Sequence, residues 1–256
     1  MTTTVDAQLV AAKVQHMYKL VAENPHGTYH FETGRPLAER LGYDPDVLDL
    51  VPVEAIESFA GVGHFFDLAG LVPGEHVVDL GSGSGMDAFI AAHHVGPDGT
   101  VVGVDFTPEQ LDKARRLATR SGVDHVRFQS GRIERLPLDD QSADCVISNG
   151  VINLCPDKAA VFAEANRVLR PGGRLAIADI ITEQPLTDAI VCDADLWASC
   201  IGGAAQQDAY VRDIEAAGLH VEEVRANPYG FLSPSARAAS TTYGVKSISL
   251  LARRTE

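Results

Sequence analysis

A glycine-rich turn between an apolar run and a helical pattern is the segment of this sequence best suited to hold a small molecule. The segment reads VVDLGSGSGMDAF over residues 77–89. Its glycines, Gly81, Gly83 and Gly85, let the backbone turn tightly and come close to a ligand. The free N–H groups at the start of the next helix can face an anion or a carboxylate. Three alternating glycines are a weak signal alone, and nicotinamide-binding proteins usually carry the wider G-x-G-x-x-G spacing.

An acidic residue, Asp105, ends the next apolar run, 20 residues beyond Gly85. In nucleotide-binding sheets a carboxylate at this place meets the ribose hydroxyls. The alternative is that Asp105 only marks the entry to a helix, just ahead of Thr107. We favour the ribose role, because the strand, the glycines and the acid occur together.

Side chains able to accept a proton cluster outside this region. His26, Tyr29 and His30 lie in NPHGTYHFETGRP, and His64 lies just before the glycine-rich turn. An imidazole or a nearby carboxylate could act as a base on a bound acceptor. Each of these residues could equally be a surface or packing residue. As a group they predict that one contacts the acceptor.

The elements that would position these residues alternate regularly from residue 76 onward. Apolar, β-branched runs predict strands at 76–80, at 99–105, near 125, 143, 172 and 219, and at 245–252. Between them lie helix patterns, one opened by a capping box from Thr107 to Gln110 with Pro108 at the first helical position, another opened by Asp157. Such alternation predicts an α/β protein with a largely parallel sheet covered on both faces.

Two segments fall outside this alternation. In residues 1–70, Val10, Val14, Met17 and Val21 form one helical stripe that should pack against the main domain. We expect residues 1–70 to form a helical lid or substrate cap. Residues 71–256 would form the ligand-binding domain, interrupted by an irregular insert at 182–205.

Composition limits the partners. The chain has 256 residues, with 21 Lys plus Arg against 35 Asp plus Glu and a formal charge of −14. Such a chain repels phosphate backbones and anionic lipids, so we expect a small-molecule substrate, no nucleic acid and no membrane. The start, MTTTVDAQ, has no secretory pattern, and the four cysteines have no metal-ligand spacing. We therefore expect a cytoplasmic monomer or homodimer with reduced thiols and no metal site.

The combined motifs resemble a known family. VVDLGSGSG with Asp79 ahead of it, VGVD, and the strand that follows LRPGG are similar to class I S-adenosylmethionine (SAM)-dependent methyltransferases over about residues 70–252. The resemblance implies a Rossmann-like, seven-stranded sheet with an antiparallel last strand. It also implies SAM as cofactor and S-adenosylhomocysteine as product. The residues expected to bind the cofactor are Gly81, Gly83, Gly85 and Asn149 at the methionine part, Asp105 at the ribose, and Ile133 and Glu134 at the adenine, together with Asp79 and Phe106.

A closer resemblance is to arsenite methyltransferases, carried by SFAGVGHFF, SNGVINLCPDK and SCIGGA over most of 55–220. Those enzymes hold trivalent arsenic with cysteine thiolates. Two of the thiol positions are changed here, to Val62 and Gly150, and only Cys200 keeps the pattern. Because arsenic(III) is thiophilic, this loss should weaken its capture.

Several residues near the expected acceptor have two readings. Gly150 either makes room for a bulky acceptor or permits a turn. Trp197 either stacks on an aromatic acceptor or anchors the insert. Cys155 and Cys192 either pack a loop or line a pocket, whereas Cys145 reads as a buried strand residue. The residues expected to contact substrate are Tyr18, Gly150, Trp197 and Cys200.

Three functions follow. The first is SAM-dependent methylation of a small organic acceptor, aromatic or heteroaromatic and indole-like, in secondary metabolism. The second is an arsenite methyltransferase that uses Cys155, Cys192 and Cys200. The third is a SAM-binding protein without turnover. Methyl transfer from a sulfonium is an in-line displacement, favoured by a dry pocket that holds a near-attack geometry.

Overall fold

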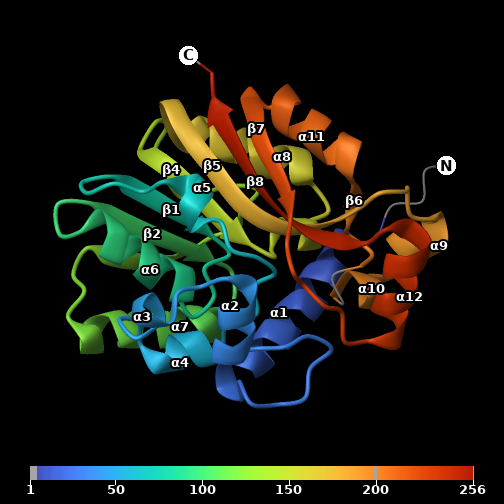
Figure 1. The fold of residues 1–256 in the computed structure, drawn as a ribbon, viewed down its shortest axis with the longest axis horizontal. Coiled ribbons are helices and arrows are strands. Elements are labelled where there is room, and N and C mark those ends of the chain that lie inside the picture. Colours follow the sequence, from blue (N-terminus) through green and yellow to red (C-terminus); the bar gives the residue numbers. More distant parts are fainter. Residues whose placement is uncertain (1–4, 199–200, 256) are drawn as a thin grey trace.

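A mixed β-sheet forms the centre of the computed structural model, which describes residues 5–198 and 201–255 (Figure 1). Its strands are β1 (His76–Leu80), β2 (Thr100–Asp105), β3 (Val126–Ser130), β4 (Ala143–Asn149), β5 (Leu169–Thr182), β6 (Ala205–Gln206), β7 (Leu219–Ala226) and β8 (Lys246–Arg254). The order is β3-β2-β1-β4-β5-β8-β7, and β6 pairs with β5 outside this path. Strands β1 to β6 pair in parallel, whereas β8 is antiparallel to β5 and β7. The predicted sheet and its antiparallel last strand are confirmed, with the two-residue β6 as an addition.

Helices cover both faces of the sheet. They are α1 (Ala7–Glu23), α2 (Arg35–Leu41), α3 (Pro45–Leu48), α4 (Val53–Glu57), α5 (Phe66–Ala69), α6 (Met86–Val95), α7 (Pro108–Ser121), α8 (Lys158–Val168), α9 (Asp188–Val191), α10 (Ala194–Ala198), α11 (Gln207–Ala216) and α12 (Pro234–Tyr243), with a 3₁₀ turn η1 at Ile152–Leu154. Among the described residues no helix is long and apolar enough to span a bilayer.

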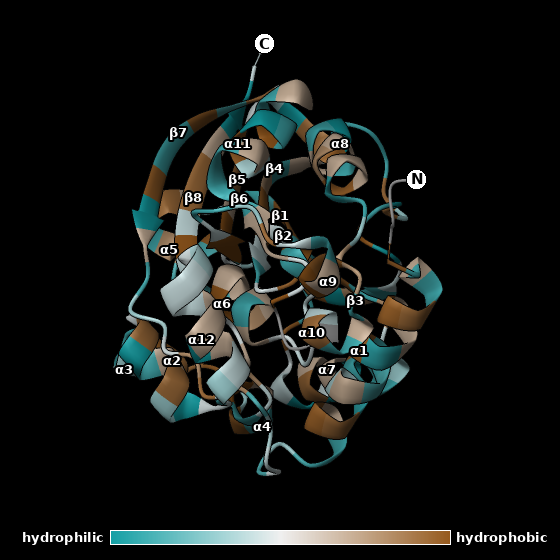
Figure 2. Ribbon diagram, turned by 90° about the vertical axis from the view of Figure 1, so that its right-hand side faces the viewer, coloured by the Kyte–Doolittle hydropathy of each residue, from teal (hydrophilic) through white to brown (hydrophobic). Residues whose placement is uncertain are grey.

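The central strand β1 is largely apolar on both sides because the sheet separates two cores. Val77 of β1 belongs to the core shared with α6 and α7, and the next residue, Val78, belongs to the core shared with α8 and α11. Adjacent strand residues point to opposite faces, so a strand covered twice must be apolar at nearly every position. Figure 2 shows the result, with hydrophobic strands inside and hydrophilic residues concentrated on the outer helix surfaces.

The N-terminal helices share one of these cores. Val10 and Val14 of α1 are buried in the same cluster as residues of α6 and α7, which confirms the predicted stripe. Figure 1 shows α1 crossing below the sheet, beside α7 and α10. The irregular segment 182–205 contains α9, α10 and β6. Whether residues 1–70 act as a substrate cap stays a prediction.

Helix α7 begins where its sequence indicates, but the capping box does not form. Thr107 is the N-cap residue and its side chain makes no capping hydrogen bond. Instead, Asp105 Oδ1 accepts a hydrogen bond from the backbone N–H of Thr107, at 2.7 Å. The side chain of Gln110, the last residue of the predicted box, is thereby free for other contacts. Helix α8 does begin with a side-chain cap, because Asp157 accepts from the N–H of Ala160.

A buried hydrogen bond between α11 and β5 gives a test of this packing. The Tyr210 hydroxyl donates to Asp179 Oδ2 at 2.6 Å, and burial raises the pKa of Asp179 to about 6. We expect Tyr210→Phe to lower the free energy of unfolding by about 1–3 kcal/mol, measured by urea denaturation. The loss should be larger at pH 8 than at pH 5, because above its pKa the buried carboxylate is ionised and most needs the donor.

The matched control is Tyr243→Phe at the end of α12, a half-buried tyrosine, for which we expect a change within ~0.5 kcal/mol. An equal loss at both pH values for Tyr210→Phe would contradict the role given to Asp179.

Candidate functional site

A cavity opens at the carboxyl ends of β1, β2 and β4. It contains about 1070 Å³ of empty space, part of it open to solvent. Six segments line it, and they come from α1, residues 55–61, residues 79–87, residues 105–110, residues 132–134 and residues 149–156. Ligands of open α/β sheets bind at this edge, where strand connections diverge to opposite faces.

The glycine-rich turn has the backbone conformation that its sequence indicates. Gly81, Gly83 and Gly85 have φ values of 68°, 53° and 96°, in the left-handed region that other residues rarely adopt. A Cβ on Gly81 would lie 2.5 Å from the side chain of Val151, so the close packing also requires glycine. Helix α6 starts at Met86 without a side-chain cap, which leaves N–H groups available to a ligand.

The carboxylate of Asp105 joins the glycine turn to the end of β2. Its Oδ2 accepts from the Gly83 N–H at 2.9 Å, and its Oδ1 accepts from the Thr107 N–H. Burial raises the pKa of Asp105, and the hydrogen bonds from Thr107 and Gly83 oppose that shift. The side chain is thus held rigidly at the wall of the cavity.

Two further carboxylates lie at the cavity, and one lacks a donor. Asp79 is buried, and its Oδ2 has no hydrogen-bond partner among the described residues. Burial, followed by the charges of Asp87 and Asp105, raises the pKa of Asp79 well above its ordinary value. Asp87 accepts from the Tyr43 hydroxyl at 2.7 Å and from Asn149 Nδ2 at 3.0 Å, and burial raises its pKa to about 6. A bound cationic group would stabilise both ionised forms.

The amide of Asn149 links these acids to the segment ahead of the turn. Its Oδ1 accepts from the N–H of Val62 at 2.7 Å, while its Nδ2 donates to Asp87 and to the carbonyl of Gly63. Asn149 therefore fixes the loop at 61–63 beside the carboxylates.

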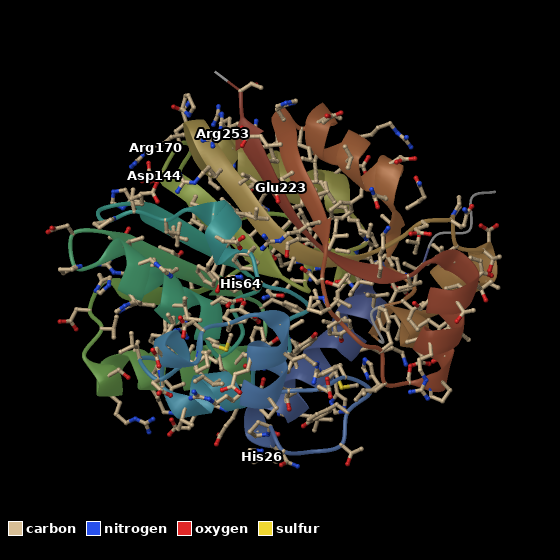
Figure 3. All side chains as sticks on the ribbon, viewed as in Figure 1. His26, His64, Asp144, Arg170, Glu223 and Arg253 are labelled. Carbon is tan, nitrogen blue, oxygen red and sulfur yellow. The ribbon has the colours of Figure 1, made fainter. Side chains whose placement is uncertain are left out.

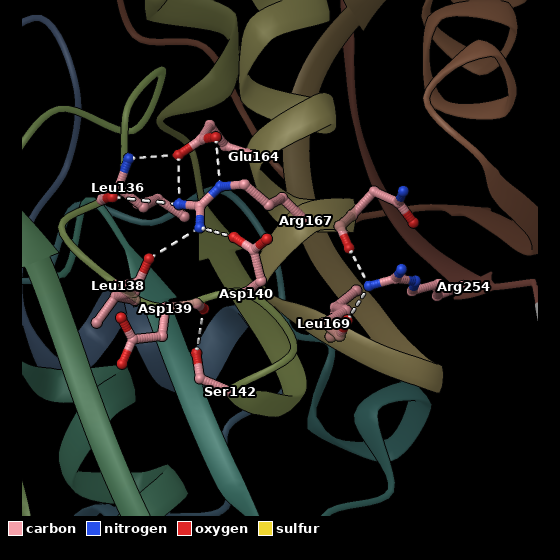
Figure 4. Close-up of polar contacts among 10 residues, drawn as sticks. Leu136, Leu138, Asp139, Asp140, Ser142, Glu164, Arg167, Leu169 and Arg254 are labelled. Atoms are coloured by element: carbon pink, nitrogen blue, oxygen red, sulfur yellow. Dashed lines mark hydrogen bonds and ion pairs between the residues drawn. The ribbon is translucent and has the colours of Figure 1, made fainter.

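Phe106, Ile133 and Glu134 also line the cavity. The loop that carries the last two is held from behind by Arg167 of α8 (Figure 4). Arg167 donates to the carbonyls of Leu138 at 2.9 Å and Leu136 at 3.2 Å. These hydrogen bonds fix residues 136–138, which follow Ile133 and Glu134 in the chain.

The structure brings together all nine residues predicted to bind the cofactor, since every one of them lines this cavity. Tyr18 of α1, predicted to contact substrate, lines it too. The roles themselves stay predictions.

The four predicted bases do not line the cavity. His26 is exposed and lies 3.7 Å from Glu57, the Tyr29 hydroxyl donates to the carbonyls of Leu20 and Asn24, and His30 packs edge-on against Phe31. His64 packs against Tyr43, with ring centroids 4.8 Å apart, and burial lowers its pKa. Figure 3 shows His26 at the outer edge of the molecule, far from His64. Their catalytic role stays a prediction that this geometry does not support.

Gly150 and Trp197 also lie outside the cavity lining. Gly150 has φ 69°, and a Cβ there would lie 3.1 Å from Val62 Cγ1. The space next to Gly150 is therefore filled by Val62, which favours the turn reading. Trp197 is buried, its Nε1 donates to the Val191 carbonyl, and Lys158 Nζ lies 4.9 Å from its ring centroid. These contacts favour the anchoring role for Trp197.

The cysteines differ in their surroundings. Cys155 lines the cavity, and burial raises the pKa of its thiol to about 12. Cys145 is fully buried in β4, as expected, Cys192 is half-buried at the end of α9, and Cys200 lies outside the described residues. Within residues 5–198 and 201–255 no group of three or more His, Cys, Asp or Glu side chains is arranged to hold a metal ion.

Comparison with known proteins assigns this fold and cavity to a class. Residues 71–218 match the family model described as a methyltransferase domain, and the chain belongs to that family. It is a class I SAM-dependent methyltransferase by fold, similar to arsenite methyltransferases. The cofactor of this class is SAM.

Three relatives show the extent of the likeness. The arsenite methyltransferase of Halobacterium salinarum is 43% identical over 193 residues, a match covering 75% of this chain and 49% of the relative. The crystal structure of CrArsM, an arsenic(III) SAM methyltransferase from Chlamydomonas reinhardtii, gives a TM-score of 0.69 with 33% identity and covers 84% of this chain and 75% of that one. Methyltransferase GfsG of Streptomyces halstedii is 34% identical over 189 residues, a match covering 72% of this chain and 66% of the relative. The chain spans about half the length of the Halobacterium relative.

The residues present fit SAM. Asp79 offers an unpartnered buried carboxylate oxygen, and the hydroxyl of Ser82 at the same wall also lacks a partner among the described residues. SAM carries an ammonium and a sulfonium, which such groups would stabilise, and a ribose whose hydroxyls need acceptors.

Substitution of Asp105 tests its placement at the ribose. We expect Asp105→Ala to weaken SAM binding by about 1.5–3 kcal/mol, the value of a hydrogen bond to a charged group. Isothermal titration calorimetry measures the change, with the exposed Asp98→Ala as matched control. Unchanged affinity in Asp105→Ala would contradict the placement.

The raised pKa values predict that SAM binding releases protons. A cationic ligand favours the ionised forms of Asp79 and Asp87, so the affinity should increase as the pH rises through their raised pKa values, which for Asp87 is about 6. Calorimetry in two buffers of different ionisation enthalpy counts the protons. Asp79→Asn should bind SAM more weakly and release fewer protons, whereas Asp98→Asn should behave as the wild type. Equal proton release by wild type and Asp79→Asn would show that Asp79 does not face the cationic end.

Proposed function

We propose that this chain transfers the methyl group of SAM to a small organic acceptor, aromatic or heteroaromatic and indole-like. The observation that carries the proposal is the apolar wall of the cavity. Val14 of α1, Phe59 and Leu154 line the same space as the glycine turn, and burial of a flat apolar molecule against such side chains is favourable.

The thiol positions support an organic acceptor over arsenite. Val62 and Gly150 replace the thiols of the arsenite enzymes, and Val62 is itself packed over Gly150. The one described thiol at the cavity, Cys155, has a pKa of about 12. A protonated thiol is a poor ligand for a soft metalloid, because the thiolate is the binding form.

SAM, when bound, supplies an electrophilic methyl group on a sulfonium. The chain's part is to hold the donor and exclude water around the acceptor. The glycine turn and Asp105 would fix the nucleoside, while Val14 and Phe59 orient the acceptor and keep water away, so that the reacting atoms stay aligned. None of the four predicted bases lines the cavity. As the bond from the acceptor to the methyl carbon forms and the sulfonium C–S bond breaks, the proton that an indole or phenol loses would pass to a carboxylate of the cavity, such as Glu134, or to solvent.

Arsenite methylation is the second candidate, and the likeness to the Halobacterium and Chlamydomonas proteins favours it. In this case the thiols of Cys155, Cys192 and Cys200 would bind the arsenite.

One assay separates the candidates. The full chain is incubated with SAM and either arsenite or a panel of indoles and phenols, and S-adenosylhomocysteine is measured by mass spectrometry. We expect product with a member of the organic panel and the same rate in Cys155→Ser, because the thiol takes no part. The control is Cys145→Ala, a cysteine buried in β4 away from the cavity.

The opposite pattern would favour arsenite: product formed only with arsenite and lost in Cys155→Ser and Cys200→Ser but retained in Cys145→Ala. SAM binding without product from any acceptor would favour the third function, a binding protein without turnover.

We further propose that residues 1–70 form a substrate cap and that the protein is a cytoplasmic monomer or homodimer acting in secondary metabolism. We propose no nucleic-acid or membrane partner, and the formal charge of −14 supports this.

A further inference from the structure

The side chain of Gln110 connects the glycine turn to helix α1. Gln110 is 1% exposed. Its Oε1 accepts a hydrogen bond from the hydroxyl of Ser84, and its Nε2 donates to the backbone carbonyl of Tyr18 at 2.8 Å. Ser84 belongs to the glycine turn and Tyr18 to α1, two segments 66 residues apart in the sequence that both line the cavity.

The orientation of the amide is fixed by its partners. A backbone carbonyl only accepts, so the nitrogen of Gln110 must face Tyr18 and the oxygen must face Ser84. The Ser84 hydroxyl then has to donate. Because both ends of a buried amide are satisfied in only this arrangement, movement of either segment leaves a buried polar group without its partner.

A second contact attaches α1 to the same region. Gln15 Nε2 donates to the backbone carbonyl of Phe106 at 2.9 Å, and the more exposed Lys19 lies 2.8 Å from Glu109. Helix α1 is thus held by residues 106–110, next to Asp105. Its own Val14 and Tyr18 form part of the cavity wall.

We propose that Gln110 is a positioning residue through which cofactor binding and the docking of α1 stabilise each other. The inference rests on the proposed function, which places SAM in this cavity. SAM on the glycine turn fixes Ser84, and through the Gln110 amide it fixes the Tyr18 carbonyl on α1. The coupling is reciprocal, so docked α1 must strengthen SAM binding by the same factor.

Cleavage by endoproteinase Lys-C tests the coupling without a known acceptor. Lys13 and Lys19 lie in α1, and cleavage inside a docked helix requires local opening. In the wild type, SAM should slow cleavage at these two sites on the order of 10-fold, a common size of coupling. In Gln110→Met, which keeps the length of the side chain but neither hydrogen bond, saturating SAM should slow it less than about 2-fold. Cleavage at Lys246 in β8 is the internal reference.

Gln15→Met provides a second variant that should lose part of the protection, in case Gln110→Met folds poorly. The exposed Gln8→Met, on the first turn of α1, should behave as the wild type. If Gln110 only supported the fold, Gln110→Met would speed cleavage at Lys13 and Lys19 by the same factor with and without SAM. That result would overturn the proposal. So would full SAM protection in both variants.

Isothermal titration calorimetry on the same samples distinguishes a failure of the coupling from a failure of the proposed function. SAM binding to the wild type without protection of α1 would overturn the coupling alone. No SAM binding to the wild type would overturn the proposed function, and the coupling with it.

Discussion

The carboxylate of Asp105 is the constraint on which the cavity depends. It accepts one backbone hydrogen bond from Gly83 and one from Thr107, so a single side chain sets the glycine turn, the end of β2 and the start of α7 relative to one another. A buried carboxylate is costly unless it is hydrogen-bonded, and these two N–H groups provide that compensation. Because Asp105 caps α7 from two residues ahead, Gln110 is released from the helix start and can reach α1.

Charge gives the cavity its preference among ligands. Asp79, Asp87 and Asp105 are buried within one region, and burial raises the pKa of each. Asp87 is compensated by Tyr43 and Asn149, whereas one oxygen of Asp79 has no donor among the described residues. An anionic ligand would add to this repulsion, and a cationic one would relieve it. Apolar side chains such as Val14 and Phe59 line the same cavity, a combination suited to a sulfonium.

The sequence predicted the parts whose signal is local. The central strands β1 and β4 are largely buried because both of their faces are covered, and each glycine of the turn has a positive φ, so pattern and structure agree there. The parts it could not predict depend on contacts between distant segments. Nothing in the sequence pattern singles out Asp87, in the first turn of α6, because only the fold brings Tyr43 and Asn149 to it. Gln110 fitted a capping box, but Asp105 takes over that task. His26 and His30 have suitable chemistry, yet neither lines the cavity. Gly150 suggested open space, which Val62 fills.

A crystal structure with S-adenosylhomocysteine would test the central claim most directly, because it locates the nucleoside without any knowledge of the acceptor. We predict the ribose hydroxyls within hydrogen-bonding distance of Asp105, the adenine beside Ile133 and Glu134, and the amino-acid end beside Asp79. A nucleoside bound elsewhere, or turned so that its ribose lies away from Asp105, would contradict it.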